Sequence, residues 1–276
     1  MSVPVGALGM ALAVYLGICL FMFFSQRQLM YYPDREPLDA ARAGAGWQTV
    51  STQTSDGLQL THLHRPAQAG RPTLLLFHGN AGHAGHRVGK LDFLTGSGVG
   101  IFLSEYRGFG GNPGAPTEEG LFADARSTLA WLAGEGVAGR DLILYGESLG
   151  SGVATAMASE LAAAGTPVAG VILEAPFTSM AAAAQFHYPI LPARWLVLDR
   201  YDSLSRIGGI GTRLLILHGE ADRTVPFALG RQLYESAAEP KSFLPLSGIG
   251  HVAHFERPEA VEAVRDFVLG DGQASD

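Results

Sequence analysis

One serine in this sequence has neighbours that suit a nucleophile. Ser148 lies in the pentapeptide GESLG, between Gly146 and Gly150. An apolar run typical of a buried strand precedes it, and an alanine-rich stretch typical of a helix follows it. At such a turn the serine backbone is strained, and the residues two places away pass so close to it that only glycine fits. The pattern predicts a nucleophile elbow, in which the N-terminus of the following helix favours an oxyanion.

A serine hydroxyl also needs a base that takes its proton and an acid that orients the base. Asp222 lies in the loop after the apolar run 213–218, and His251 lies in a glycine-rich loop before the last apolar-periodic segment. In triads whose serine lies in a nucleophile elbow, the acid and then the histidine follow the serine along the chain, as Asp222 and His251 follow Ser148 here. These three residues are therefore the predicted catalytic triad.

Other titratable residues remain alternatives for the two supporting roles. Glu220, nearer the strand end than Asp222, and Glu174, after an earlier strand, are alternatives for the acid. His254 is an alternative for the base, although a histidine beside Phe255 more often packs at the start of a helix. The sequence favours Asp222 and His251 and leaves these alternatives open.

A developing oxyanion requires two donors. The backbone N–H of Leu149 follows the nucleophile, and a His-Gly-Asn turn after the first apolar run places the N–H of Asn80 as the predicted second donor. The spacing of His78, His83 and His86 also suggests a metal site, but no carboxylate or cysteine stands near them in the sequence. We therefore expect neither a metal nor a cofactor.

The elements that must position these residues follow from the hydrophobic pattern. Residues 47–54 and 58–65 predict an antiparallel hairpin. Short, nearly continuous apolar runs predict buried parallel strands at 73–78, 99–105, 141–146, 168–174, 213–218 and 241–246. Helical patterns occupy 84–98, 117–136, 151–165, 227–237 and 257–270. The alternation predicts a doubly wound α/β sheet.

The N-terminal segment differs from the rest of the chain. Residues 3–24 carry no charge, and a helix of that length matches a hydrocarbon core of about 30 Å. A buried core helix or a cleaved signal peptide is the alternative, but the segment has neither a polar stripe nor a basic leader. We predict a membrane anchor at 1–26 followed by one catalytic domain at 27–276.

The flanking charges suggest the orientation of this anchor. Arg27, Arg35 and Arg42 follow the apolar segment and no basic residue precedes it, which places the main domain in the cytoplasm. Lysine occurs only at Lys90 and Lys241 in an alanine- and glycine-rich chain, which is typical of GC-rich bacterial genomes. The expected location is a bacterial inner membrane, crossed once.

The composition excludes several other classes. The chain has 276 residues, of which 47% are hydrophobic and 16% charged, so a folded body is expected in place of a disordered chain. The net charge of −7 and the scattered basic residues exclude a nucleic-acid partner. A single cysteine, Cys19, excludes an internal disulfide framework. Nothing in the composition indicates the oligomeric state.

Several motifs together make the chain resemble a known superfamily. They read LMYYPD, FHGNAGH, EYRGFGGNPGAPTEEGLFADA, YGESLGSGVA, EAPFTS, LHGEADRTVPF and GIGH. From about residue 31 to 269 the sequence is similar to the α/β-hydrolase superfamily, in particular to its membrane-anchored serine hydrolases of the Bem-type and acyl-protein-thioesterase-like group. The resemblance implies a mostly parallel eight-stranded sheet with helices on both faces and a small cap after strand 6. It also implies that Arg107 is a buried ion-pair partner.

One position departs from the family pattern. Many members carry a polar pair after the last histidine, whereas Val252, Ala253 and His254 follow here. The departure concerns the choice of base between His251 and His254 and leaves the choice of Ser148 as nucleophile unchanged.

The segment 178–203 is too apolar for a plain surface connection, and we expect it to form the cap, the alternative being that it closes the core. The residues expected to line a substrate site are Phe177, Phe186, Tyr188, Leu191 and Trp195. An apolar cap beside a membrane anchor favours a lipophilic acyl ester or thioester, including a lipid or an acylated protein. The sequence predicts a serine hydrolase acting through an acyl-enzyme, with a serine peptidase or a non-catalytic binding protein as the alternative.

Overall fold

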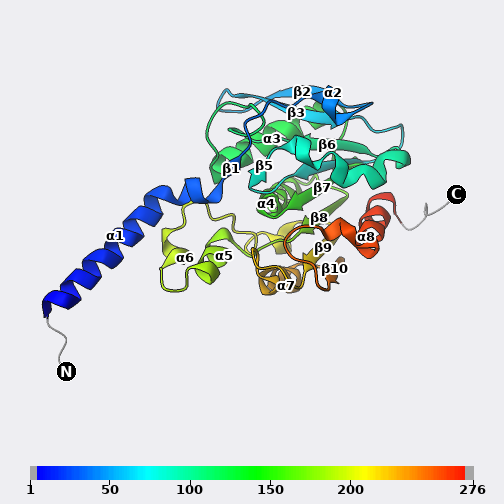
Figure 1. Ribbon diagram of the computed structural model, residues 1–276. Helices are drawn as coiled ribbons and strands as arrows, with labels where there is room; N and C mark the ends of the chain where they lie inside the picture. Colours follow the sequence, from blue (N-terminus) through cyan, green and yellow to red (C-terminus); the bar gives the residue numbers. More distant parts are fainter. Residues whose placement is uncertain (1–4, 271–276) are drawn as a thin grey trace.

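A computed structural model describes residues 5–270 and contains one large sheet (Figure 1). Its strands are β2 (Gln48–Gln53), β3 (Gln59–Arg65), β4 (Thr73–Phe77), β6 (Gly100–Ser104), β7 (Leu142–Glu147), β8 (Gly170–Glu174), β9 (Leu214–Gly219) and β10 (Lys241–Leu246). The spatial order is β10-β9-β8-β7-β4-β6-β3-β2. β3 pairs antiparallel with β2 and β6, and the other pairs are parallel. The predicted eight-stranded α/β-hydrolase sheet is confirmed.

Helices cover both faces of this sheet. The elements α3 (Glu118–Gly134), α4 (Leu149–Ala163) and α7 (Phe227–Ser236) share one apolar cluster with the sheet. A second cluster on the other face contains α8 (Pro258–Leu269). Central strands such as β4 and β8 are buried along their whole length, which explains their unbroken apolar sequence.

The helix expected at 84–98 has a different form. The chain there makes two 3-10 segments, η1 (Ala84–Arg87) and η2 (Gly89–Ser97). Gly85, Gly89 and Gly96 weaken a regular α-helix, because glycine loses more backbone entropy on folding than other residues.

The N-terminal helix α1 (Val5–Met30) projects from the body in Figure 1. It continues four residues beyond the predicted anchor end at 26. The most apolar 18-residue window of its segment Gly6–Met30 has a mean hydropathy of 2.3, and the segment is long and apolar enough to cross a membrane. Its last turn meets the body beside the carboxyl edge of the sheet.

The expected cap lies between β8, the sixth strand of the large sheet, and β9. It contains α5 (Met180–His187) and α6 (Ala193–Leu196), which lie beside the C-terminal half of α1 (Figure 1). Ser179 begins α5 by accepting a hydrogen bond from the main chain of Ala182.

A second, very small sheet was not expected from the sequence. β1 (Tyr32–Pro33) pairs in parallel with β5 (Ala81–Gly82). It joins the segment directly after α1 to the loop that follows β4.

Candidate active site

The turn between β7 and α4 has the geometry of a nucleophile elbow. Ser148 has a φ of 50°, in the left-handed region that side chains seldom occupy. A Cβ atom on Gly150 would lie 2.0 Å from the carbonyl oxygen of Phe77, and one on Gly146 would lie 2.6 Å from the Cα of Ser151. The two glycines are required because the start of α4 packs directly against β4 and β7.

Ser148, His251 and Asp222 form one hydrogen-bonded chain. The Oγ of Ser148 lies 3.0 Å from Nε2 of His251, and Nδ1 of His251 lies 2.8 Å from Oδ2 of Asp222. The other carboxylate oxygen accepts from the main chain of Thr224 at 2.8 Å and of Val225 at 2.9 Å. An ionised Asp222 accepts from Nδ1–H, so that Nε2 is free to accept the serine proton.

The surroundings keep Asp222 ionised. Burial by itself raises the pKa of this carboxyl, but hydrogen bonds from His218 and His251 and from the backbone N–H of Val225 outweigh burial. The pKa of Asp222 therefore lies well below its usual range.

The alternative acid and base residues have other partners. Nδ1 of His254 lies 2.8 Å from Oε1 of Glu174, and both side chains are buried. Glu220 accepts a hydrogen bond from the hydroxyl of Ser247. Among the described residues, no hydrogen bond links any of these side chains to Ser148.

A buried charge cluster lies behind the elbow. Lys90 Nζ lies 2.6 Å from Glu147 and 2.5 Å from Glu174, and Arg87 contacts Glu147 at 2.7 Å. Burial raises the pKa of Glu174, but Lys90 and His254 together outweigh burial and lower that pKa to about 2. These four side chains and His251 line a polar cavity of about 350 Å³. His251 thus lines the polar cavity and contacts Ser148, which lines the apolar cavity described below.

The two predicted oxyanion donors lie beside Ser148 on one cavity wall. Leu149 is the first residue of α4, so its N–H has no acceptor within the helix. The main-chain N–H of Asn80 has no acceptor among the described residues, while its carbonyl accepts from Tyr32 at 2.8 Å. Both N–H groups are thus available to a ligand.

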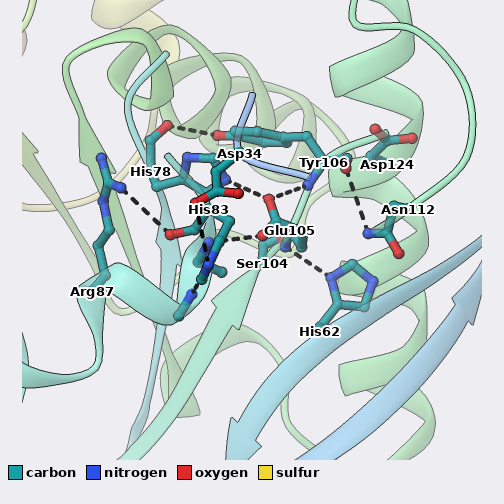
Figure 2. Close-up of polar contacts among 12 residues, drawn as sticks. Asp34, His62, His78, His83, Arg87, Ser104, Glu105, Tyr106, Asn112 and Asp124 are labelled. Atoms are coloured by element: carbon teal, nitrogen blue, oxygen red, sulfur yellow. Dashed lines mark hydrogen bonds and ion pairs between the residues drawn. The ribbon is translucent and has the colours of Figure 1, made fainter. Parts of the chain in front are cut away.

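A buried network holds the loop that carries Asn80 (Figure 2). The carboxylate of Glu105 lies 2.7 Å from Nε2 of His78 and accepts from the main chain of Ala84 at 2.7 Å and of Tyr106 at 3.0 Å. The hydroxyl of Tyr106 donates to the carbonyl of His78. No role was predicted for Glu105 from the sequence. The available signal was a carboxylate at the end of the mostly apolar run 99–105.

The expected role of Arg107 is confirmed. Its guanidinium contacts Asp124 at 2.8 Å and Asp56 at 2.8 Å. The carboxylate of Asp124 is buried, and it also accepts from the main chain of Arg107, so the ion pair fixes the start of the loop after β6.

Of the three histidines considered for a metal site, His78 has a separate partner, whereas the ring centroids of His83 and His86 lie 3.9 Å apart. His78 is taken by Glu105, while His83 and His86 lie 3.8 and 3.6 Å from Asp34, a carboxylate that the sequence analysis did not place there. Nδ1 of His83 accepts a hydrogen bond from the main chain of Gly85, so its Nε2 carries the proton. In this tautomer Nε2 of His83 offers no lone pair to a metal.

An apolar cavity of about 260 Å³ opens beside Ser148. Three of the expected lining residues, Phe177, Tyr188 and Leu191, lie on its wall. The prediction was wrong for Phe186 and Trp195, which lie outside the cavity and are 61% and 80% exposed.

Phe186 lies outside the cavity because a different face of its helix points inward. Ala183, Ala184 and His187 face the cavity, and Phe186 points to another side of the same helix. The cavity wall also contains four residues that the sequence analysis missed, all on α1: Met22, Gln26, Leu29 and Met30.

Comparison with known proteins places the chain among hydrolases. Residues 68–205 match the family described as serine aminopeptidase, S33. The uncharacterized protein Rv2307c of Mycobacterium tuberculosis is 39% identical over 240 residues, which cover 85% of this chain and 83% of that protein. The lysophosphatidylserine lipase ABHD12 of Danio rerio is 35% identical over 226 residues, 73% of this chain and 59% of that lipase.

Solved structures show the same fold. An esterase of Pyrococcus furiosus, PF2001, has a TM-score of 0.67 at 19% identity, covering 87% of this chain and 97% of the esterase. An alpha-beta hydrolase of Vibrio vulnificus has a TM-score of 0.68 at 19% identity, covering 84% of this chain and 88% of that one.

Proposed function

The chain belongs to the serine aminopeptidase S33 family of the α/β-hydrolase superfamily, and we propose that it is a membrane-anchored serine hydrolase that cleaves carboxylic esters or thioesters of lipophilic acyl groups. The observation that supports this most is the chain Ser148–His251–Asp222 at the side of an apolar cavity. The name of the zebrafish relative, a lysophosphatidylserine lipase, supports a lipid as the acyl donor.

The proposed reaction has two halves. Ser148 Oγ attacks the acyl carbonyl while His251 Nε2 takes its proton, and the N–H groups of Leu149 and Asn80 hold the resulting oxyanion. As the tetrahedral intermediate collapses, the bond to the alcohol or thiol breaks, and His251 returns the proton to that leaving group. Water then attacks the acyl-enzyme by the same route, which releases the acid and restores Ser148. No step requires a cofactor.

The membrane location belongs to the same proposal. In it, residues 1–26 anchor the chain by crossing the bacterial inner membrane once, and residues 27–276 form the catalytic domain on the cytoplasmic side. The length and hydropathy of α1 support the anchor, and the arginines that follow it support the orientation.

A fluorophosphonate probe tests the reaction class on the full chain in detergent. We expect one adduct per molecule, mapped by mass spectrometry to Ser148, and no adduct in Ser148→Ala or His251→Ala. Turnover of a p-nitrophenyl acyl ester should fall on the order of 10⁶-fold in Ser148→Ala. His254→Ala is the matched control and should still be labelled, with folding of each variant checked by thermal unfolding.

The family description also names a peptidase, so a second substrate class is measured beside the first. Aminoacyl p-nitroanilides report amide cleavage by the same triad. Hydrolysis of anilides without hydrolysis of acyl esters would replace the esterase with a peptidase. Absence of an adduct on folded wild-type protein would favour a binding protein.

A further inference from the structure

The end of α1 forms part of the active-site cavity. Met22, Gln26, Leu29 and Met30 recur at helical spacing, lie on one face of the helix and line the cavity beside Ser148. The segment expected to hold the protein in the membrane therefore also contacts the space available to an acyl chain.

Directional contacts hold this wall against the cap. The guanidinium of Arg27 donates to both carboxylate oxygens of the buried Asp199, at 2.9 and 3.1 Å. The side-chain amide of Gln26 donates to the carbonyl of Leu196 at 3.2 Å and accepts from the main chain of Leu198 at 2.8 Å. A helix fixed in this way keeps a constant cavity shape.

The cap also reaches far along α1. The hydroxyl of Tyr15 donates to the carbonyl of Ile190 at 2.9 Å. Tyr15 precedes Arg27 by three helical turns, and at the α-helical rise this separation is about 18 Å. A bilayer whose boundary lies near Arg27 therefore encloses the cap loop that contains Ile190 together with α1.

The side chains on the outside of the cap suit such a position. We call Phe186, Ile190, Trp195 and Leu198 the cap face; they are 61%, 80%, 80% and 50% exposed. These exposed apolar side chains lie on a segment that contacts α1, which is itself exposed and apolar. A large exposed apolar surface of this kind indicates contact with a membrane and not with water. Arg194 and Arg200, which are exposed on the same segment, can extend toward lipid phosphates.

We propose that the cap face lies in the bilayer beside α1, between Tyr15 and Arg27, and that the acyl chain enters the cavity from the bilayer, between α1 and the cap. This inference rests on the proposed function, because it concerns how an acyl substrate reaches Ser148. The occupant of the cap face is thus the lipid bilayer, and the α1 wall limits which acyl chains fit.

The position of the cap is tested by fluorescence in vesicles. The chain has three tryptophans, so Trp47→Phe with Trp131→Phe leaves Trp195 as the only reporter. The full chain is reconstituted in phosphatidylcholine vesicles with or without bromine on the acyl chains. The matched control, Trp131→Phe with Trp195→Phe, leaves Trp47, which directly precedes β2.

We expect brominated lipid to quench Trp195 strongly and Trp47 weakly, with iodide in the buffer giving the opposite order. Quenching of Trp195 by iodide but not by brominated lipid would overturn the proposal and leave a protein partner or a second copy as the occupant of the cap face.

The contribution of α1 to the cavity wall is tested by measuring which acyl-chain lengths the enzyme prefers. Met22→Trp adds bulk on the cavity side of α1, while Leu20→Trp adds the same group on the exposed side. We expect Met22→Trp to lower kcat/KM for long-chain p-nitrophenyl esters about tenfold relative to the butyrate, and Leu20→Trp to leave that ratio unchanged. An unchanged ratio in both variants would contradict the proposal that α1 limits which acyl chains fit the cavity. Fluorophosphonate should still label Ser148 in both variants. If the wild-type protein itself were not labelled, the result would contradict the proposed function and not this inference.

Discussion

The side-chain amide of Asn80 donates a 2.7 Å hydrogen bond to the main-chain carbonyl of Met30, the last residue of α1. The main-chain carbonyl of Asn80 accepts from Tyr32, and β1 and β5 pair directly beside this contact. The loop that carries one proposed oxyanion donor is therefore attached to the end of the apolar helix.

Asn80→Ala tests this attachment. The variant keeps the main-chain N–H that holds the oxyanion but loses the bond to Met30. We expect kcat to fall about tenfold with little change in KM, because the donor is less well placed. The free energy of unfolding should fall by about 1 kcal/mol. Steady-state kinetics with a soluble ester and thermal unfolding measure both, and a wild-type kcat would show that the attachment does not position the donor.

Asp222→Asn tests the orientation of His251. An amide in this position can donate to Nδ1 and so favours the tautomer that cannot accept the serine proton. We expect kcat to fall on the order of 10⁴-fold while the fold is retained. Ester hydrolysis and circular dichroism are the measurements. A variant within tenfold of wild type would remove Asp222 from the triad, and Glu220→Gln serves as the matched control.

Gly150→Ala tests the steric requirement of the elbow. Its new Cβ would lie 2.0 Å from the carbonyl oxygen of Phe77, so α4 must move away from β4. We expect a loss of more than about 3 kcal/mol of stability together with loss of fluorophosphonate labelling. In Gly134→Ala the new Cβ meets nothing within 4 Å, and this control should be at least as stable as wild type. A Gly150→Ala protein with wild-type stability would contradict the packing of α4 described above.

His62 predicts how stability depends on pH. Burial lowers its pKa to about 4, although the charge of Glu105 opposes the shift, and its two ring nitrogens contact Thr52 and the main chain of Glu105 at 2.9 Å each. The unfolded chain, with a histidine pKa of about 6.5, binds the proton first. The neutral, buried His62 therefore contributes about 3 kcal/mol to the free energy of unfolding. This contribution is complete above about pH 6.5 and is lost as the pH falls toward 4.

The measurement is the unfolding free energy of wild type and His62→Gln in detergent across that pH range. The buried His64 shifts in the same direction, so both proteins should lose stability in acid. We expect the wild type to lose more, and parallel pH profiles would contradict a neutral, buried His62.

The sequence predicted the large sheet because its strands are short, apolar and separated by clear turn residues. The proximity of Ser148, Asp222 and His251 followed from topology, since the carboxyl ends of parallel strands meet at one edge. The tertiary contacts could not be predicted this way. Asp34 and Glu105 reach the loop after β4 from distant segments, and no local pattern reports that approach.

The cavity lining shows the same limit. Phe186 and Trp195 were chosen because they are large and apolar, but a short helix does not reveal which of its faces points inward. Met22 was assigned only to the apolar anchor, and Met30 lay beyond its predicted end at 26. The uniform hydropathy of the anchor gives no sign that one stripe of the helix contacts the body. These positions depend on how α1 and the cap pack together.

The contacts at the end of α1 restrict which changes in chain length this protein can tolerate. Arg27 is held by Asp199, Met30 by Asn80 and Tyr31 by Tyr201, in the last turn of the helix and the residue that follows it. One inserted or deleted residue within that turn rotates everything upstream by about 100° and shifts it by about 1.5 Å, which removes Met22 and Gln26 from the cavity. Insertions before Tyr15 change only the length of the apolar segment. The helix therefore has one end whose register is fixed by contacts with the body and one end whose length can change without altering those contacts.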